Sequence, residues 1–209
     1  MIEAARRRMD QLASSACPRD NYTMADDTAP WRPELVAGLR LLARISDALH
    51  RRGLPRPILV GGAAVEYYSA SALMTGDIDI TSPIQSEVEA ELVRFGFTKP
   101  EGLGHTPLGW VHPEMALGLE IVASTPMDGN VDYRRMVLIE GLDPGHAFVM
   151  IPVEDLIADR MGQFASGTAP EMLEQARVLF LLNPDLDLPY LETRIRHETG
   201  DDHGVEDLR

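Results

Sequence analysis

Two aspartates separated by one residue, Asp77 and Asp79, lie in a short run whose other members are mostly apolar. If this run is a strand, both carboxylates face the same way, while Ile78 and Ile80 point into the core. The carboxylates would then lie about 7 Å apart and repel each other by roughly 2 kcal/mol at an effective dielectric constant near 20. Magnesium held by one or two carboxylates and a substrate's phosphates would relieve that repulsion. The spacing therefore predicts a metal site, and the alternative is a solvated strand end.

A glycine pair, Gly61-Gly62, precedes the acidic run and directly follows the apolar residues Ile58-Leu59-Val60. The missing side chains allow the backbone to approach a ligand, and free N–H groups at the start of a helix suit a phosphate. Taken alone, the pair is better explained as a tight turn. The order strand, glycine pair, helical stretch and acidic strand within one unit favours a phosphate and metal site.

This order of motifs resembles the signature of the nucleotidyltransferase superfamily of polymerase-β type. The glycine pair is followed by fourteen residues (63–76) and then by Asp77-Ile-Asp79-Ile. The phrase Leu-Val-Gly-Gly-Ala-Ala-Val, with Thr75 just ahead of the acidic pair, is most similar to small bacterial nucleotidyltransferases of uncertain function, some of which belong to toxin–antitoxin pairs. The resemblance covers residues 57 to about 182. Leu73-Met74 stand where relatives commonly have an arginine.

A third acidic residue, Glu120, lies inside the apolar segment Leu119–Val122. A lone charge in a core strand is costly unless it meets a cation. The resemblance implies that a carboxylate on a neighbouring strand completes the metal site, and Glu120 stands where it is expected, although many relatives have aspartate. The alternative is an edge-strand residue that faces water.

The resemblance also extends to Pro152-Val-Glu-Asp and the helix after it. Arg160 would take the place of the family's usual lysine, and Glu171 or Glu174 that of an aspartate. Arg160 could then neutralise a phosphate. An ion pair within the helix, with Asp155 or Asp159, is at least as good an explanation.

The function that the resemblance implies is Mg²⁺-dependent transfer of a nucleotidyl group from a nucleoside triphosphate to an unidentified acceptor. Two Mg²⁺ ions would be held by Asp77, Asp79 and Glu120, and the nucleotide would be bound by Gly61, Gly62, Thr75 and Arg160. Such a transfer uses metal ions to stabilise the entering and leaving oxygens. The alternative is a non-catalytic protein of this fold that binds a nucleotide or a partner protein, as in a toxin–antitoxin pair. A third hypothesis is a structural domain whose acidic strand is merely solvated.

The net charge and the single cysteine limit which ligands and which surroundings are expected. A formal net charge of −14 over 209 residues argues against a long nucleic acid as ligand, because such binding draws on many basic contacts to phosphates. The acceptor is therefore expected to be a protein side chain or a small molecule. A single cysteine, Cys17, precludes an intrachain disulfide, and no apolar run has the length of a membrane span. We expect a cytoplasmic protein without membrane contact.

The hydrophobic pattern predicts an α+β fold, in which a mixed sheet is flanked by helices and followed by a C-terminal helical extension. Helices are expected over 34–52, from 82 to 96, after Pro152, from about 171 to 182 and over 189–197. Strands are expected at 58–60 and 77–81, and within 109–113, 117–123, 131–139 and 147–151.

These elements divide the chain into four parts. Residues 1–30 are expected to be a loosely ordered lead-in that includes a possible short helix at 2–13. Residues 31–151 would form the nucleotidyltransferase core, and residues 152–197 would be helices packed on it. The acidic, glycine-containing residues 198–209 are expected to be disordered.

Other residue types that could bind a ligand are better explained by structure. Three arginines before the first strand could reach a triphosphate but suit the dipole at a helix end: Arg51, Arg52 and Arg56. His105 and His112 lack the spacing of a zinc site. Trp110 could stack on a base, but burial is the better explanation.

Overall fold

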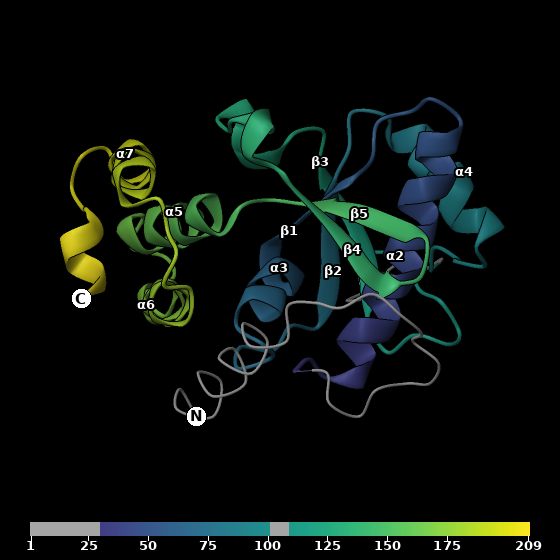
Figure 1. Ribbon diagram of the computed structural model, residues 1–209, viewed down its shortest axis with the longest axis horizontal. Coiled ribbons are helices and arrows are strands. Elements are labelled where there is room, and N and C mark those ends of the chain that lie inside the picture. The colour runs from purple at the N-terminus through teal and green to yellow at the C-terminus, as the bar shows by residue number, and fades with distance from the viewer. Residues whose placement is uncertain (1–29, 101–108) are drawn as a thin grey trace.

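A computed structural model describes residues 30–100 and 109–209 of the chain. The predictions for the lead-in, for Cys17 and for His105 lie outside these residues. Figure 1 shows a central sheet with helices at both ends. The strands are β1 (Ile58–Val60), β2 (Asp77–Thr81), β3 (Gly118–Ala123), β4 (Val137–Asp143) and β5 (His146–Met150), in the order β3-β2-β1-β5-β4.

The sheet is mixed. Strand β1 pairs antiparallel with β2 and parallel with β5, while β2 pairs parallel with β3, and β4 pairs antiparallel with β5. Parallel neighbours need a crossover connection, and here the segment with α4 (Gln85–Arg94) joins β2 to β3. The predicted α+β class, with a mixed sheet flanked by helices, is confirmed.

Helix α2 (Pro33–Arg51) packs on the sheet because its apolar residues repeat at helical spacing. Five residues on one face are at most 1% exposed: Leu35, Leu39, Leu42, Ile45 and Leu49. Proline occupies the first position of the helix, and Gly53 follows its end in a left-handed conformation, φ 75°. The start and end therefore agree with the sequence pattern within two residues.

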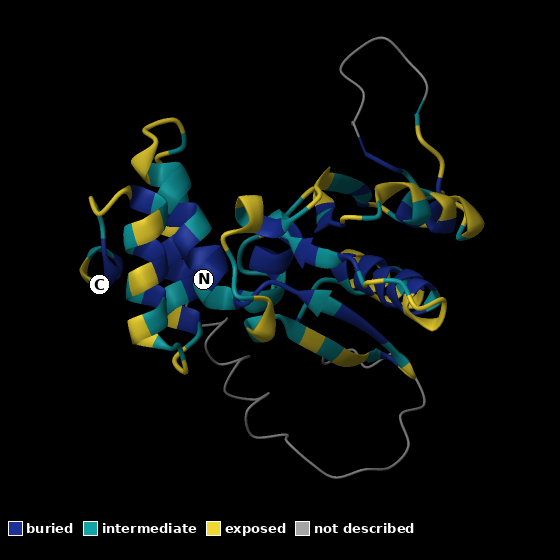
Figure 2. Ribbon diagram, turned by 90° about the horizontal axis from the view of Figure 1, so that it is seen from above, coloured by how far each residue is buried: buried dark blue, intermediate teal, exposed yellow. Residues whose placement is uncertain are grey.

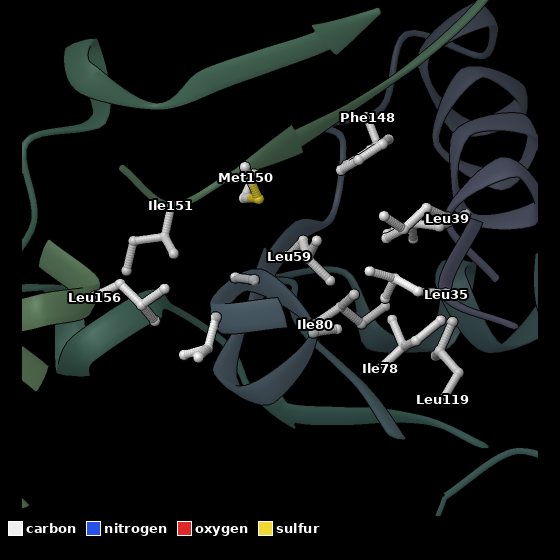
Figure 3. Packing of buried hydrophobic residues seen from close by; sticks show 14 of the residues in the cluster. Leu35, Leu39, Leu59, Ile78, Ile80, Leu119, Phe148, Met150, Ile151 and Leu156 are labelled. Carbon is white, nitrogen blue, oxygen red and sulfur yellow. The ribbon is translucent and has the colours of Figure 1, made fainter. Parts of the chain in front are cut away.

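The remaining helices gather at the other end of the sheet (Figure 1). Helix α3 (Gly61–Tyr68) connects β1 to β2, and α5 (Val153–Ala165), α6 (Met172–Leu182) and α7 (Leu188–Thr199) follow the last strand. One apolar cluster runs from Leu35 on α2 through Leu59 on β1 to Leu156 on α5 (Figure 3). The sheet and the C-terminal helices thus share one core, and Figure 2 marks buried residues in both parts.

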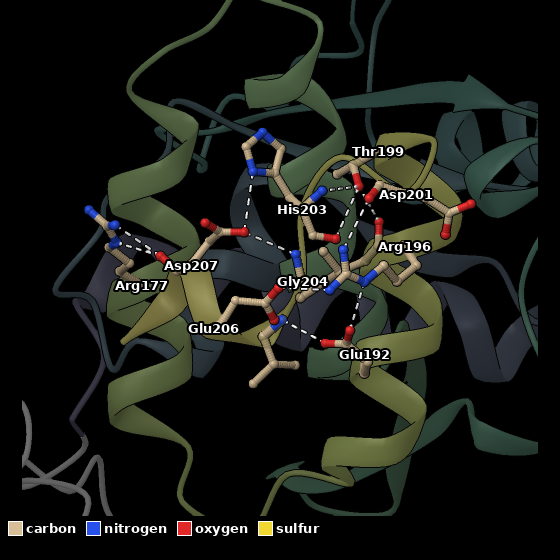
Figure 4. Close-up of polar contacts among 11 residues, drawn as sticks. Arg177, Glu192, Arg196, Thr199, Asp201, His203, Gly204, Glu206 and Asp207 are labelled. Carbon is tan, nitrogen blue, oxygen red and sulfur yellow. Dashed lines mark hydrogen bonds and ion pairs between the residues drawn. The ribbon is translucent and has the colours of Figure 1, made fainter.

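The C-terminal tail differs from its predicted disorder. Residues after α7 form a 3₁₀ helix, η3 (Val205–Leu208), whose Val205 and Leu208 are 7% and 2% exposed. Arg196 on α7 binds Glu206, and Arg177 on α6 donates to the main-chain oxygen of Asp207 (Figure 4). The acidic composition suggested disorder, but Arg196 pairs with Glu206, Arg177 binds a main-chain oxygen of the tail, and two apolar side chains enter the core.

Three local predictions also differ. Residues 109–113 form isolated bridges at Trp110 and Val111, not a strand of the sheet. Within 131–139, residues 133–135 form a 3₁₀ turn before β4 begins. Helix α4 begins at Gln85, because the hydroxyl of Ser82 accepts the N–H of Ile84 at 3.3 Å in a turn that precedes the helix.

Within the described residues, none of the helices combines the length and the apolar character needed to cross a membrane.

Candidate active site

Strand β2 positions the two aspartates as its alternation requires. Ile78 and Ile80 are fully buried, and Asp77 and Asp79 lie on the opposite face, Asp77 exposed and Asp79 partly buried. The parallel register of β2 with β3 places Asp79 directly beside Glu120. One carboxylate oxygen from each of the three acids can be chosen so that all lie within 4.8 Å of one another. We call these three residues the acidic triad.

The glycine pair lets α3 begin close to this triad. Gly61 is left-handed, φ 62°, and a Cβ on it would lie 2.9 Å from the Cβ of Asp79. A Cβ on Gly62 would lie 3.0 Å from the Cβ of Thr75. The main-chain N–H of Gly62 acts to lower the pKa of Asp79, so this donor, which the sequence suggested for a phosphate, lies near the triad. A side chain on Gly61 would therefore displace Asp79 of the acidic strand, and one on Gly62 would displace Thr75 just ahead of that strand.

A cleft of about 320 Å³ opens beside the triad. Gly61, Gly62 and Asp79 line one wall, and Asp159, Arg160 and Gln163 of α5 line the other. The pocket is thus formed jointly by the sheet and the C-terminal helices, which explains why neither sequence segment could reveal it alone.

Arg160 lines the cleft and forms one of the two ion pairs proposed for it. Its side chain lines the cleft, and it also donates to Asp159 at 2.8 Å and to the side-chain oxygen of Gln175 at 3.1 Å. The other pairing considered is wrong, since Asp155 is buried and binds Arg194 at 2.6 Å. Arg160 and Asp79 therefore line the same cleft, and the positive charge of Arg160 acts to lower the pKa of Asp79.

The acids expected to accompany Arg160 lie elsewhere. Glu171 and Glu174 are exposed and do not line the cleft. The acid of α5 that lines the cleft is Asp159, for which the sequence suggested only an ion pair with Arg160. Gln163, one helical turn later, donates to Asp159 at 2.8 Å. The four-residue spacing of the two polar side chains on α5 was the signal that could have identified them.

Thr75 contacts the triad and does not line the cleft. Its hydroxyl lies 3.3 Å from Oδ1 of Asp77 and 3.2 Å from the main-chain oxygen of Asp77. The predicted nucleotide-binding role of Thr75 therefore has no support in the cleft lining, and its contacts are with a triad carboxylate.

The electrostatics of the triad favour a bound cation. Burial raises the pKa of Asp79 to about 6, and the negative charges of Asp77 and Glu120 add to this, against the Gly62 hydrogen bond and the positive charge of Arg160. Within the described ranges, none of the three carboxylates forms a salt bridge with a basic side chain. Three clustered oxygen donors without a cationic partner match the ligand preference of Mg²⁺.

Asp77 and Glu120 also line a second cavity, of about 270 Å³. Its other lining residues are glycines and apolar side chains: Gly76, Gly109, Val111, Met115, Ala116, Leu117, Gly118 and Leu119. Asp79 faces the first cleft and its two partners face the second, so the triad borders both.

The remaining candidates serve the fold. Arg52 pairs with Glu87 and Glu91, and Arg56 pairs with Asp47 at 2.5 Å, so neither approaches the glycine pair. Both arginines therefore pair with carboxylates of the fold, and the helix-end explanation stays a prediction.

The aromatic candidates are packing residues. The ring of His112 lies 5.1 Å from that of Phe97, and its Nδ1 accepts the N–H of Glu114. Trp110 is 9% exposed, with the Lys99 ammonium 5.8 Å from its ring centroid. Both agree with the structural explanations given for them.

No family model matches the chain, and a comparison with curated proteins finds no relative. Among solved structures, the chain is similar to the solution structure of the antibiotic-resistance factor ANT(2'')-Ia, for which substrate-regulated conformation dynamics are described. The two share 19% identity at a TM-score of 0.49, over 77% of this chain and 90% of that one. At this level, the likeness supports no conclusion about chemistry.

Proposed function

We propose that this protein transfers a nucleotidyl group from a nucleoside triphosphate to an acceptor in a Mg²⁺-dependent reaction. The observation that carries the proposal is the acidic triad: Asp77, Asp79 and Glu120 present oxygens within 4.8 Å of one another beside a glycine-walled cleft. Three carboxylates so arranged repel one another unless a cation binds.

The triad residues would hold two Mg²⁺ ions. When bound there, the ions would supply charge stabilisation for an in-line displacement at the α-phosphate, in which the acceptor oxygen enters and pyrophosphate leaves. Arg160 would offset phosphate charge from the facing wall, and the side-chain-free surface of Gly61 and Gly62 would admit the phosphates close to β2. The chain itself need supply no nucleophile.

The two cavities suggest which substrate binds where. The cleft with Arg160 suits the anionic triphosphate. The second cavity, with Asp77, Glu120 and apolar side chains but no Lys or Arg in its described lining, suits an acceptor that carries no phosphate charge. Together with the net charge of −14, this favours a protein side chain or a small molecule over a polynucleotide.

The test compares two labels on the nucleotide. The protein, Mg²⁺ and clarified cell extract are incubated with α-³²P-labelled or γ-³²P-labelled nucleoside triphosphates. Transfer of the α label but not the γ label to a product is expected, and Asp77→Asn should reduce transfer at least about 100-fold by removing a metal ligand. Asp185→Asn, a matched change at an exposed residue outside both cavities, should not alter it.

The outcomes separate the alternatives. Undiminished transfer by Asp77→Asn would refute the assignment of the metal site. Tight binding of a non-hydrolysable triphosphate with Mg²⁺ but no transfer would favour the non-catalytic nucleotide-binding or partner-binding module, including a toxin–antitoxin role. No binding of metal or nucleotide would leave a structural domain.

A further inference from the structure

Glu66 on α3 is a fully buried carboxylate outside both cavities. Burying such a charge is costly unless it is paired and hydrogen-bonded. Arg32 donates to it twice, from Nε at 2.6 Å and Nη2 at 2.9 Å, and the Ser71 hydroxyl donates at 2.9 Å. The fourth donor is the main-chain N–H of Thr75, at 2.8 Å. The carboxylate is thus satisfied, and one of its bonds leads toward the acidic triad.

Arg32 and Glu66 together hold the main chain of Thr75 from both sides. Glu66 accepts the Thr75 N–H, and Nη2 of Arg32 donates to the Thr75 carbonyl oxygen. The arginine that reaches this threonine lies 43 residues earlier in the chain, whereas Leu73-Met74 directly precede it.

The segment that carries Thr75 needs such fixation. Ala70 and Ser71 both have left-handed backbones, φ 51° and 60°, which non-glycine residues adopt at a cost. Trp31, next to Arg32, stacks on Tyr67 at 4.7 Å between ring centroids and donates to its carbonyl oxygen at 2.8 Å. The start of α2 is therefore anchored to α3 over the same segment.

Thr75 then touches the site itself. Its hydroxyl contacts Asp77, and its Cβ occupies the space that a side chain on Gly62 would need. The contacts therefore run from Arg32 and Glu66 through Thr75 to a triad carboxylate and to the glycine pair. Residues that contact and orient a metal ligand, without binding the metal themselves, commonly change the affinity for the metal.

We propose that Arg32 and Glu66 are positioning residues, which orient Asp77 for metal binding by fixing Thr75. This inference rests on the proposed function, since it assigns Asp77 to a metal site. A buried ion pair is by itself weak evidence for stability, and specific orientation of a neighbouring group explains its presence here.

The test measures Mn²⁺ affinity by electron paramagnetic resonance in the absence of nucleotide. Glu66→Gln keeps the side-chain shape but weakens the hold on Thr75, and Arg32→Lys loses the two-pronged geometry. Each should weaken Mn²⁺ binding about 10-fold, at the lower end of the usual effect of such supporting groups. The matched controls are Asp143→Asn and Arg44→Lys, which weaken a salt bridge of 2.7 Å away from both cavities and should leave Mn²⁺ affinity unchanged.

Two further variants protect the test from misfolding. Arg32→Met/Glu66→Met removes both charges together, which proteins tolerate better than loss of one partner, and should show the same loss of Mn²⁺ affinity. Thr75→Val, which removes the hydroxyl contact to Asp77, should lower affinity on its own. The Thr75→Val/Glu66→Gln double variant should bind Mn²⁺ little more weakly than the weaker of the two single variants, because both changes act on one chain of contacts.

The outcomes are distinct. Folded Arg32 and Glu66 variants that bind Mn²⁺ within twofold of the unaltered protein would overturn the positioning role while leaving the metal site intact. Equal losses in the Arg44 and Asp143 controls would also overturn it, by showing a general effect of stability. If the unaltered protein binds no Mn²⁺, the proposed function fails and this inference fails with it.

Discussion

At the scale of single residues, the three carboxylates of the acidic triad lie together without a salt bridge to any basic side chain of the described residues. Asp79 is partly buried and has Asp77 two residues away on its own strand and Glu120 beside it on the next. Its raised pKa, about 6, means that the metal-free fold is stabilised when this carboxyl takes up a proton. A site that costs stability when empty is typical of a functional centre.

The first prediction follows from this cost. Because the folded pKa lies above the ordinary value of 3.8, the contribution of Asp79 to stability should fall as the pH rises from about 4 to about 6. Asp79→Asn removes the charge and should raise the free energy of unfolding at pH 7 in EDTA by roughly 1 to 2 kcal/mol, a figure reduced for partial exposure. Urea denaturation of the variant and of the unaltered protein measures this difference in the free energy of unfolding. The gain should disappear near pH 4, and a loss of stability at pH 7 would contradict the account.

At the scale of elements, pairing decides which side chains meet. The parallel register of β2 and β3 places Glu120 beside Asp79, and a slip by one residue would turn Glu120 to the opposite face of the sheet. The apolar neighbours Leu119 and Ile121 resist such a slip, since it would expose them. The buried face of β3 thus fixes the position of the triad's third member.

The C-terminal 3₁₀ helix η3 carries the second prediction. Leu208 is 2% exposed in the core cluster shared with α5 and α7, so Leu208→Ala should lower the free energy of unfolding by about 2 to 3 kcal/mol. Leu181→Ala, at a 46% exposed position of α6, should change it by less than about 0.5 kcal/mol. Urea denaturation again provides the measurement, and equal effects of the two changes would mean that the tail does not pack.

At the scale of the whole molecule, the first cleft has walls from two parts of the chain. Gly61 and Asp79 belong to the sheet region, and Arg160 belongs to the helices that follow Pro152. Core packing at Ile151 and Leu156 joins them (Figure 3). A bound nucleotide would therefore contact both parts, which makes the C-terminal helices part of the proposed site and not only an extension of the fold.

The third prediction separates nucleotide binding from metal binding. Arg160→Gln should weaken binding of a Mg²⁺-bound non-hydrolysable triphosphate about 10-fold or more, as expected for loss of a charge-assisted contact to phosphate. Mn²⁺ binding without nucleotide should stay unchanged. Arg177→Gln on α6, which loses contacts only to the main chain of Asp207, is the control. Calorimetric titration measures both affinities, and loss of Mn²⁺ binding in Arg160→Gln would contradict the assignment.

The sequence by itself determined the features that depend on near neighbours along the chain. The Asp-Ile-Asp alternation placed two carboxylates on one face of a strand, the spacing of leucines gave α2, and Gly61-Gly62 gave a close approach of the backbone. Strand and helix periodicities are local properties, so a few consecutive residues are enough to specify them.

Only the tertiary structure decided which distant groups meet. Glu120 joins the triad through strand register, Arg32 reaches Thr75 across 43 residues, and Asp159 faces the cleft although the sequence pointed to Glu171 or Glu174. The tail is held by Arg177 of α6, which binds its main chain, and by Arg196 of α7, which pairs with Glu206, and its own composition could not show these contacts. Such contacts depend on how burial of the whole core arranges the elements, and no local pattern contains that information.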